Sequence, residues 1–216
     1  MPNPQAVLWD LDGVLVDSGS YHYEAFRQLM ADRGRHLTEA EFGRLLGLRN
    51  DSILRALLGE LPPDEMEALA ARKEGLFRRL IAGRVRALPG APVLVDRLCA
   101  ARVPQAIVSS TPRANIELIL RSLGMERKFA VVVGEEDASR GKPDPEGFLT
   151  AAIRLGVAPD GCVVLEDAPE GVAAAKRAGM RVIGVATTRR PEQLSEADLV
   201  VESLENPAVE ALLSDR

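Results

Sequence analysis

The chain alternates short apolar runs with longer segments in which apolar residues recur every three or four positions. Six runs indicate strands, because they are short, rich in Val, Ile and Leu, and bounded by Gly, Pro or charged residues. They lie at 6–9, 105–108, 130–133, 162–165, 182–186 and 199–201. Most are apolar at successive positions, which is typical of strands buried on both faces of a parallel sheet.

Segments with helical spacing separate these strands. Beyond residue 90 we predict helices at about 91–102, 112–123, 145–155, 170–179 and 207–213. Several of them stop at a glycine, as at Gly156, which is a common end for a helix. The regular alternation of strands and helices predicts an α/β fold with a Rossmann-like, doubly wound parallel sheet.

Residues 19–84 contain no strand pattern. Helical spacing covers 17–34 and about 50–58, Thr38 and Glu41 resemble a capping box, and a longer helix follows Pro62. We predict about four short helices with a small core of their own. The expected domains are therefore a Rossmann-like core of residues 1–16 and 86–216, and an inserted α-helical domain of residues 17–85.

Composition narrows the class of protein. A chain of 216 residues that is 46% hydrophobic can bury a sizeable core, and a net charge of −5 argues against non-specific nucleic-acid binding. No apolar run is long enough for a membrane span, and residues 1–5 lack the basic and apolar parts of a signal peptide. Cys99 and Cys162 are expected to be buried free thiols. These features predict a cytoplasmic protein with no obligate protein partner evident.

Ligand sites in such sheets form at the carboxyl ends of the strands, and the first strand ends in two acids, Asp10 and Asp12. The two side chains would point the same way if the chain stayed extended. Close carboxylates repel unless a cation lies between them or one is protonated. This suits a nucleophile beside a general acid/base, with a hard ion such as Mg²⁺. The alternative is a simple polar turn after a strand.

Polar residues also follow other strands or precede helices. Ser109 and Ser110 follow the second strand, where hydroxyls and free N–H groups at a helix start can bind an anion. Lys142 precedes a helix opened by proline, and could balance carboxylates and hold a phosphoryl oxygen. Glu166 and Asp167 end the fourth strand and could complete a metal site. Taken singly, these are also ordinary features: a helix cap, a solvated lysine and acids at a helix start.

As a set, these motifs resemble the haloacid dehalogenase superfamily over nearly the whole chain. The matching stretches are Asp10-Leu-Asp12-Gly, Ser109, Lys142 within Gly-Lys-Pro-Asp-Pro, and Glu166-Asp167 followed by Ala-Pro-Glu-Gly. The resemblance implies a Rossmann-like core with an α-helical cap. Asp12 separates the chain from the dehalogenase branch itself, which differs at this position and works without a metal.

The resemblance also implies roles for these residues. Asp10 attacks phosphorus and forms an aspartyl-phosphate, while Asp12 acts as acid and base and contacts Mg²⁺ through its backbone carbonyl. Ser109 and the N–H of Ser110 hold the phosphoryl group, and Lys142 balances its charge together with that of Asp10. Asp167 and Glu166 complete the metal site, so the expected metal residues are Asp10, Asp12, Glu166 and Asp167.

Within the helical segment the chain is similar to the β-phosphoglucomutase and sugar-phosphatase subfamily, at Tyr21-His22, Gly47-Leu48-Arg49 and Arg72-Lys73. This likeness implies that His22 bonds Asp12 or a substrate hydroxyl. It also implies that Arg49 binds a second phosphate or an acidic group, and that Lys73 contacts substrate at the seam between cap and core. The alternative is that these residues belong to a solvated helix face.

The chain departs from the mutases at three points: Ser18 replaces a threonine, Pro112 and Arg113 stand where a lysine is found, and the loop before Arg49 is one residue shorter. The resulting prediction is a Mg²⁺-dependent phosphatase that acts on a small phosphorylated metabolite, in the first instance a sugar phosphate. The alternatives are a β-phosphoglucomutase and a non-catalytic binding protein of the same fold. The intact acids and Lys142 argue against the last of these.

Overall fold

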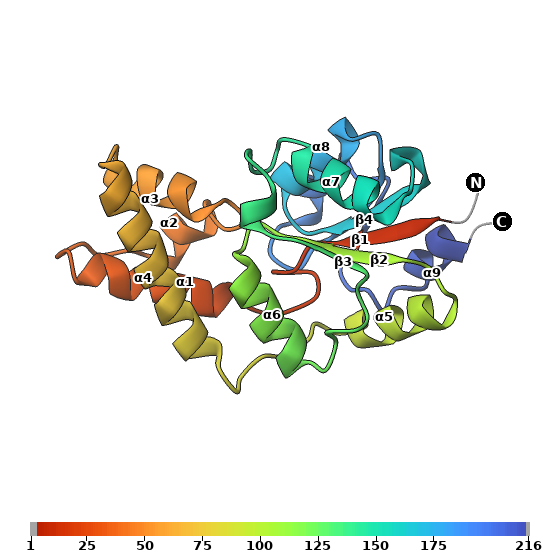
Figure 1. The fold of residues 1–216 in the computed structure, drawn as a ribbon, viewed down its shortest axis with the longest axis horizontal. Helices are drawn as coiled ribbons and strands as arrows, with labels where there is room; N and C mark the ends of the chain where they lie inside the picture. The colour runs from red at the N-terminus through yellow and green to blue at the C-terminus, as the bar shows by residue number, and fades with distance from the viewer. Residues whose placement is uncertain (1–3, 215–216) are drawn as a thin grey trace.

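The computed structural model describes residues 4–214, so Met1–Asn3 of the N-terminal segment considered above lie outside the described residues. The chain forms a parallel sheet with helices on both faces, and four further helices lie to one side of it (Figure 1). None of the helices in the described range is long and apolar enough to cross a membrane.

The sheet has six parallel strands in the order β3-β2-β1-β4-β5-β6, which confirms the predicted fold class. The strands are β1 (Ala6–Trp9), β2 (Gln105–Val108), β3 (Val131–Val133), β4 (Cys162–Glu166), β5 (Arg181–Val185) and β6 (Leu199–Val201). Leu8 of β1 pairs with Ala106 on one side and Val164 on the other. The strand order reverses between β1 and β4, and a ligand crevice is expected outside this point.

Helices cover both faces of the sheet (Figure 1). On one face lie α5 (Ala91–Ala100), α6 (Arg113–Ser122) and α9 (Pro207–Ser214), and on the other α7 (Glu146–Leu155) and α8 (Pro169–Arg177). Because side chains alternate along a strand, Val7 and Trp9 join the first cluster while Ala6 and Leu8 join the second. All four are fully buried, which explains why β1 is apolar at every position.

The remaining helices and the loops between them are called the helical block here: α1 (Gly19–Ala31), α2 (Glu39–Gly43), α3 (Asn50–Leu58) and α4 (Pro63–Ile81). The rest of the described chain is called the sheet unit. Side chains such as Phe26 and Leu54 form a separate core inside the helical block, as predicted. Phe77 and Ile81 at the end of α4 instead pack into the core of the sheet unit. The helical block is therefore anchored to the sheet unit through α4.

Local signals placed most of these elements correctly. Thr38 caps α2 as expected. Its hydroxyl accepts from the backbone N–H of Glu41 at 3.2 Å, and the Glu41 carboxylate accepts from the Thr38 N–H at 2.9 Å. The first helix is shorter than predicted, since 32–34 form a turn after Ala31. Three short 3₁₀ helices, at Glu135–Asp137, Pro159–Gly161 and Pro191–Leu194, were not predicted because such short segments show no periodicity.

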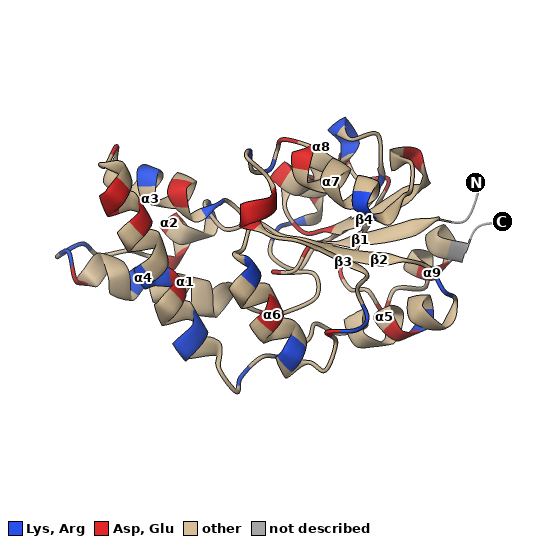
Figure 2. Cartoon of the chain, viewed as in Figure 1, with Lys and Arg blue, Asp and Glu red and all other residues tan. Residues whose placement is uncertain are grey.

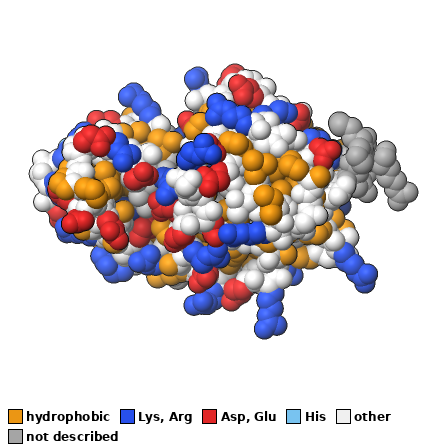
Figure 3. Space-filling view, turned by 45° about the horizontal axis from the view of Figure 1, so that its top comes forward, with side chains coloured by type: hydrophobic (Ala, Val, Ile, Leu, Met, Phe, Trp, Pro, Cys, Tyr) orange, Lys and Arg blue, Asp and Glu red, His pale blue; other side chains and the backbone are white. Residues whose placement is uncertain are grey.

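Charged side chains of both signs are spread over the helices of both parts of the molecule (Figure 2), and the face in Figure 3 likewise mixes them. This distribution fits the small negative net charge. Both cysteines are free, with Cys162 buried as predicted and Cys99 only partly buried.

Gln105 is a polar residue in an otherwise apolar strand and is 1% exposed. Its side-chain oxygen accepts a hydrogen bond from Trp9 Nε1 at 3.0 Å, and its amide nitrogen donates to the Val95 carbonyl at 3.1 Å. One glutamine thus satisfies the indole N–H of β1 and ties two strands to α5.

We expect Gln105→Leu to lower the free energy of unfolding by about 1–3 kcal/mol, because the Trp9 N–H would be left buried without an acceptor. Urea unfolding of Gln105→Leu, Trp9→Phe and the double variant measures this. The double variant should lose less stability than the sum of the single variants, since both remove the same bond. Strictly additive losses would show that the bond does not contribute.

Candidate active site

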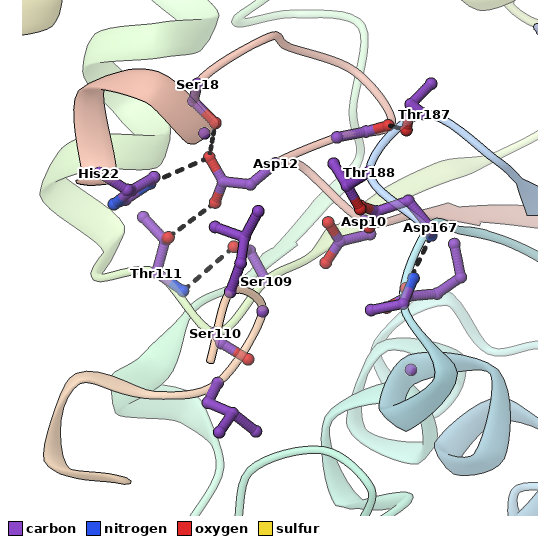
Figure 4. Close-up of a pocket in the computed structure, with 18 of the residues that line it drawn as sticks. Asp10, Asp12, Ser18, His22, Ser109, Ser110, Thr111, Asp167, Thr187 and Thr188 are labelled. Carbon is purple, nitrogen blue, oxygen red and sulfur yellow. Dashed lines mark hydrogen bonds and ion pairs between the residues drawn. The ribbon is translucent and has the colours of Figure 1, made fainter. Parts of the chain in front are cut away.

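A cavity of about 460 Å³ lies at the carboxyl ends of the central strands, between the sheet unit and the helical block. This volume is typical of a small-molecule site. Nine of the ten predicted site residues line it: Asp10, Asp12, His22, Lys73, Ser109, Ser110, Lys142, Glu166 and Asp167. Arg49 is the exception. Figure 4 shows Asp10 between Asp12 with its partners on one side and Asp167 with Thr188 on the other.

Asp10 directly follows β1 and is held by the sheet itself, since its backbone N–H donates to the Leu165 carbonyl of β4 at 2.9 Å. Lys142 Nζ donates to Asp10 Oδ1 and to Glu166 Oε1. Burial raises the pKa of Asp10 well above its usual value; Lys142 opposes this shift, and Glu166 adds to it. Asp10 is thus a buried carboxylate whose charge depends on neighbouring cations.

Lys142 is the cation that balances this end of the cavity. Burial alone would lower its pKa, but Asp10 and Glu166 outweigh burial and the pKa is raised. Its Nζ also lies 3.3 Å from the Val108 carbonyl of β2. The lysine is therefore charged and fixed in place, and is not the solvated loop residue that the sequence left open.

Asp12 lies between a bend at Leu11 and the turn at 13–15, where the chain is no longer extended, and its carboxylate has partners of its own. It accepts from the Ser18 hydroxyl, from Thr111 Oγ1 at 2.8 Å, and contacts His22 Nε2 at 3.3 Å (Figure 4). Burial alone would raise the pKa of Asp12, but His22 and the hydroxyl donors hold it well below its usual range. The pKa values of Asp10 and Asp12 are thus shifted in opposite directions, and Asp12 is ionised.

Glu166 and Asp167 end β4 and start the approach to α8. Glu166 Oε2 accepts from the backbone N–H groups of Asp167 and Ala168, at 2.9 and 3.0 Å. A Cβ at Gly171 would lie 1.8 Å from Glu166 Oε1, so only glycine leaves room for this carboxylate. Glu166 is therefore a buried residue that connects Lys142 to the start of α8 through hydrogen bonds.

Asp167 faces the cavity and receives a hydrogen bond from the Thr188 hydroxyl (Figure 4). Burial, followed by repulsion from Glu166, raises the pKa of Asp167 to about 7, although Thr188 and Lys142 oppose the shift. The protein therefore supplies too little positive charge to balance the ionised form of Asp167. A cation bound nearby would stabilise this ionised form.

The predicted metal residues therefore divide into two pairs. Both carboxylate oxygens of Asp12 and both of Glu166 accept from protein donors. Asp10 and Asp167 instead accept from Lys142 and Thr188 through one oxygen each, and both have a raised pKa. Among the described residues no three His, Cys, Asp or Glu side chains form a ready metal cluster. A hard divalent cation that uses one or two carboxylates and completes its shell with water and phosphate oxygens fits these donors.

Ser109 and Ser110 follow β2 and lead to α6. The Ser109 N–H donates to the Val133 carbonyl at 3.0 Å, and its hydroxyl accepts from the Thr111 N–H at 3.1 Å. Ser109 is buried and Ser110 half-buried beside the carboxylates. The tight turn places hydroxyl groups opposite Asp10, where an anion held by Lys142 would lie.

His22 and Lys73 approach the same carboxylates from the helical block. Lys73 is 2% exposed; its Nζ lies 2.8 Å from His22 Nδ1 and 2.7 Å from Glu74 Oε1. Because an ammonium group can only donate, His22 Nδ1 accepts and the ring proton is on Nε2, which faces Asp12. His22 also stacks on Phe77 with ring centroids 3.9 Å apart. Neither residue belongs to a solvated helix face.

Arg49 takes a different position from the one that its predicted role requires. Its Nη1 donates to the Ala138 carbonyl at 2.8 Å and its Nε lies 3.5 Å from Glu135 Oε1. It lines a small neighbouring pocket and packs closely against Gly141. Arg49 thus joins the helical block to the loop after β3. Three acids follow β3, and they do not line the main cavity: Glu135, Glu136 and Asp137. Each contacts an arginine instead.

The acids are fixed by three hydroxyl groups that were not among the predicted site residues, those of Ser18, Thr111 and Thr188. Thr188 follows β5, and Thr187 beside it bonds the Gly13 carbonyl. Both threonines follow a predicted strand, as the other site residues do, so their position at a strand end was a signal for this pair. Ser18 has no comparable signal, because its approach to Asp12 depends on the turn between them.

The whole chain has relatives among known proteins. The haloacid dehalogenase-like hydrolase family matches residues 4–179. The validoxylamine A 7'-phosphate phosphatase of Streptomyces hygroscopicus subsp. limoneus is 35% identical over an alignment of 212 residues that covers 93% of this chain and 94% of that protein. The phosphorylated carbohydrates phosphatase of Thermotoga maritima is 34% identical over 183 residues, covering 84% and 85%. The crystal structure of β-phosphoglucomutase from Clostridium difficile has a TM-score of 0.88 at 27% identity and covers 98% of both chains.

The raised pKa of Asp167 predicts a pH effect on stability in excess chelator. Folding keeps this carboxyl protonated up to about pH 7, so the stability it contributes is present in acid and is lost as the pH rises through 7. Asp167→Asn removes the ionisable group. Its unfolding temperature relative to wild type should therefore rise between pH 5 and pH 8, as measured by calorimetry.

The matched control is Asp160→Asn, which makes the same change on an exposed turn. Its difference from wild type should stay constant over this range. An equal pH dependence for both variants would contradict the assignment to Asp167.

Proposed function

The chain belongs to the haloacid dehalogenase-like hydrolase family, and from this we propose that it is a Mg²⁺-dependent phosphatase of small phosphorylated metabolites, sugar phosphates in particular. The observation that carries the proposal is the arrangement of Asp10 against Lys142, with Asp12 held separately beside it in a cavity of metabolite size. The relatives named validoxylamine A 7'-phosphate phosphatase and phosphorylated carbohydrates phosphatase support it. We further propose that it works in the cytoplasm.

In the first step a carboxylate oxygen of Asp10 attacks phosphorus while the ester bond to the leaving oxygen breaks, giving an aspartyl-phosphate. Lys142 donates to Asp10 and would also donate to the phosphoryl oxygens as negative charge develops on them. Ser109 and the N–H of Ser110 would hold the remaining oxygens. Such a transfer depends on in-line positioning and on neutralised charge, which fixed side chains in a buried site supply.

Asp12 would give its proton to the leaving oxygen and then take one from the water that attacks the aspartyl-phosphate. Its lowered pKa in the free site favours the second role. For the first, the negative charge of bound substrate has to raise this pKa, as a nearby anion does for any carboxyl group. Release of inorganic phosphate then restores Asp10.

Mg²⁺ would supply positive charge to the phosphoryl oxygens. We propose that Asp10, Asp167 and the backbone carbonyl of Asp12 hold it, with Glu166 supporting from behind through Lys142 and the start of α8. The donors are oxygens only, which is the chemistry that Mg²⁺ prefers.

We propose that residues 17–85 form a cap over a catalytic core of residues 1–16 and 86–216. The helical block lies over the carboxyl ends of the strands and contributes His22 and Lys73 to the cavity wall (Figure 1). Its own core would let it move as a unit, with the short segments on either side as hinges.

The position of Arg49 favours hydrolysis over the mutase alternative. A mutase holds a bisphosphate and so needs a cation for the phosphate that is not being transferred, but Arg49 is directed to Ala138 and Glu135. Conversion of β-glucose 1-phosphate to glucose 6-phosphate, primed with glucose 1,6-bisphosphate, should therefore be slower than phosphate release.

We expect Asp10→Asn to abolish phosphate release with the fold intact. An amide is similar in size to a carboxylate but a very poor nucleophile, so the loss should be in kcat. Phosphate release from p-nitrophenyl phosphate and circular dichroism measure the two properties. Turnover at the wild-type rate would contradict the role of Asp10.

Activity should require Mg²⁺, disappear in excess chelator and return when Mg²⁺ is added back. Ca²⁺ should not replace it, because it prefers more ligands and a looser geometry than in-line transfer needs. Steady-state assays in the presence of each ion test this. Full activity in excess chelator would exclude the metal.

A further inference from the structure

Lys73 is a cation in the cavity wall of the helical block, and its charge is already neutralised. Glu74 Oε1 accepts from Lys73 at 2.7 Å and from Asn50 Nδ2 at 2.8 Å, and Glu74 Oε2 accepts from Asn115 Nδ2. Burial alone would raise the pKa of Glu74, but Lys73 and these donors lower it. The pair is therefore a buried, fixed ion pair.

Asn115 fixes this ion pair from the sheet unit. It lies on α6 and is fully buried, and its side-chain oxygen accepts from Arg78 Nη1 at 2.9 Å. Arg78 and Glu74 are one turn apart on α4, so one asparagine binds two residues of the same helix. Lys73 is consequently held at the cavity wall without a free positive charge to offer.

Arg49 is the second cation of the helical block near the cavity, and it too is engaged. It is held by the Ala138 carbonyl and by Glu135, with Asp51 at 3.8 Å. Among the described residues that line the cavity there are eight acids and two lysines, and no arginine. Lys142, the other lysine, is paired with Asp10 and Glu166.

Four of the acids form the catalytic end, and the other four lie farther along the wall or at the mouth: Asp17, Glu74, Glu170 and Glu202. Asp17 and Glu202 are exposed, so salt screens them, while Glu74 is buried and Glu170 half-buried. Phe26, Phe42 and Ile53 supply apolar surface between them. This wall offers hydrogen-bond acceptors and apolar contact, with no uncompensated cation.

We infer that the cavity selects phosphomonoesters whose leaving group carries no second anionic group, that is, neutral polyols or amino-substituted sugars. The inference rests on the proposed phosphatase activity and names its substrate class. A second phosphate or a carboxylate on the leaving group would enter a net negative cavity and find the two cations Lys73 and Arg49 already paired. Like charges in such a site repel one another strongly, so the acids select against an anionic leaving group.

A matched series of hexose derivatives tests the inference, because its members share the phosphate and the chain length. We would measure kcat/KM with Mg²⁺ for sorbitol 6-phosphate, glucose 6-phosphate, glucosamine 6-phosphate, 6-phosphogluconate and fructose 1,6-bisphosphate. The first three should be hydrolysed at least about tenfold more efficiently than the last two. Added salt should narrow the difference, since part of the repulsion comes from exposed acids.

Glu74→Gln tests the inference through a ratio of kcat/KM values, which a general loss of activity would leave unchanged. Burial lowers the pKa of Lys73, and Glu74 opposes this shift. The amide keeps the size of the side chain but removes the counter-ion of Lys73, whose place an anionic leaving group can take. The ratio of kcat/KM for 6-phosphogluconate to that for sorbitol 6-phosphate should therefore rise several-fold. The matched control is Glu67→Gln, the same charge change on an exposed position of α4 outside the cavity lining. Its ratio should equal that of wild type.

The outcomes separate the inference from the proposed function. Equal efficiency toward 6-phosphogluconate and sorbitol 6-phosphate in wild type, or an unchanged ratio in Glu74→Gln, overturns the inference and leaves the phosphatase in place. Hydrolysis of p-nitrophenyl phosphate that Asp10→Asn abolishes supports the proposed function independently of the sugar series. Failure to release phosphate from every ester tested overturns both.

Discussion

The structure depends on how several buried carboxylates are tolerated at one edge of a sheet. Lys142 holds two of them, Asp10 and Glu166, in a region where water cannot screen their repulsion. The protein leaves Asp167 partly uncompensated, and its pKa is raised accordingly. The site is thus built with a deficit of positive charge, which suits a metal ion and its phosphate ligand.

The same edge is coupled to the helical block by a continuous chain of polar contacts. It runs from Asp12 through His22, Lys73 and Glu74 to Asn115, and so leaves the sheet unit and returns to it on α6. Every member is at least mostly buried, so each bond matters for the others. The position of the helical block and the proton on His22 are therefore set by one network.

This arrangement divides the work between the two parts of the molecule. The strand ends supply the groups that the proposed chemistry needs, and they are fixed by backbone bonds of the sheet. The helical block supplies the wall that faces the rest of a substrate. There Lys73 is paired with Glu74 of the same helix, and Arg49 with Glu135 of the sheet unit. The reaction class and the choice of substrate are consequently separate properties of the chain, which agrees with the variety of substrates among its relatives.

The sequence by itself determined the order of strands and helices, the helical insertion and the main acids, because local periodicity and strand-end position are properties of neighbouring residues. It did not identify Gln105 as the partner of Trp9, because the two residues are far apart in sequence and meet only when β1 and β2 pair in the sheet. Only the tertiary structure decided where Arg49 and Lys73 point. In sequence Arg49 is an ordinary basic residue of a loop and Lys73 one of a helix. The charge of Arg49 is neutralised by Glu135, across the interface, and that of Lys73 by Glu74, which Asn115 of α6 holds in place. Such pairings arise from packing between segments far apart along the chain, and no local pattern records them.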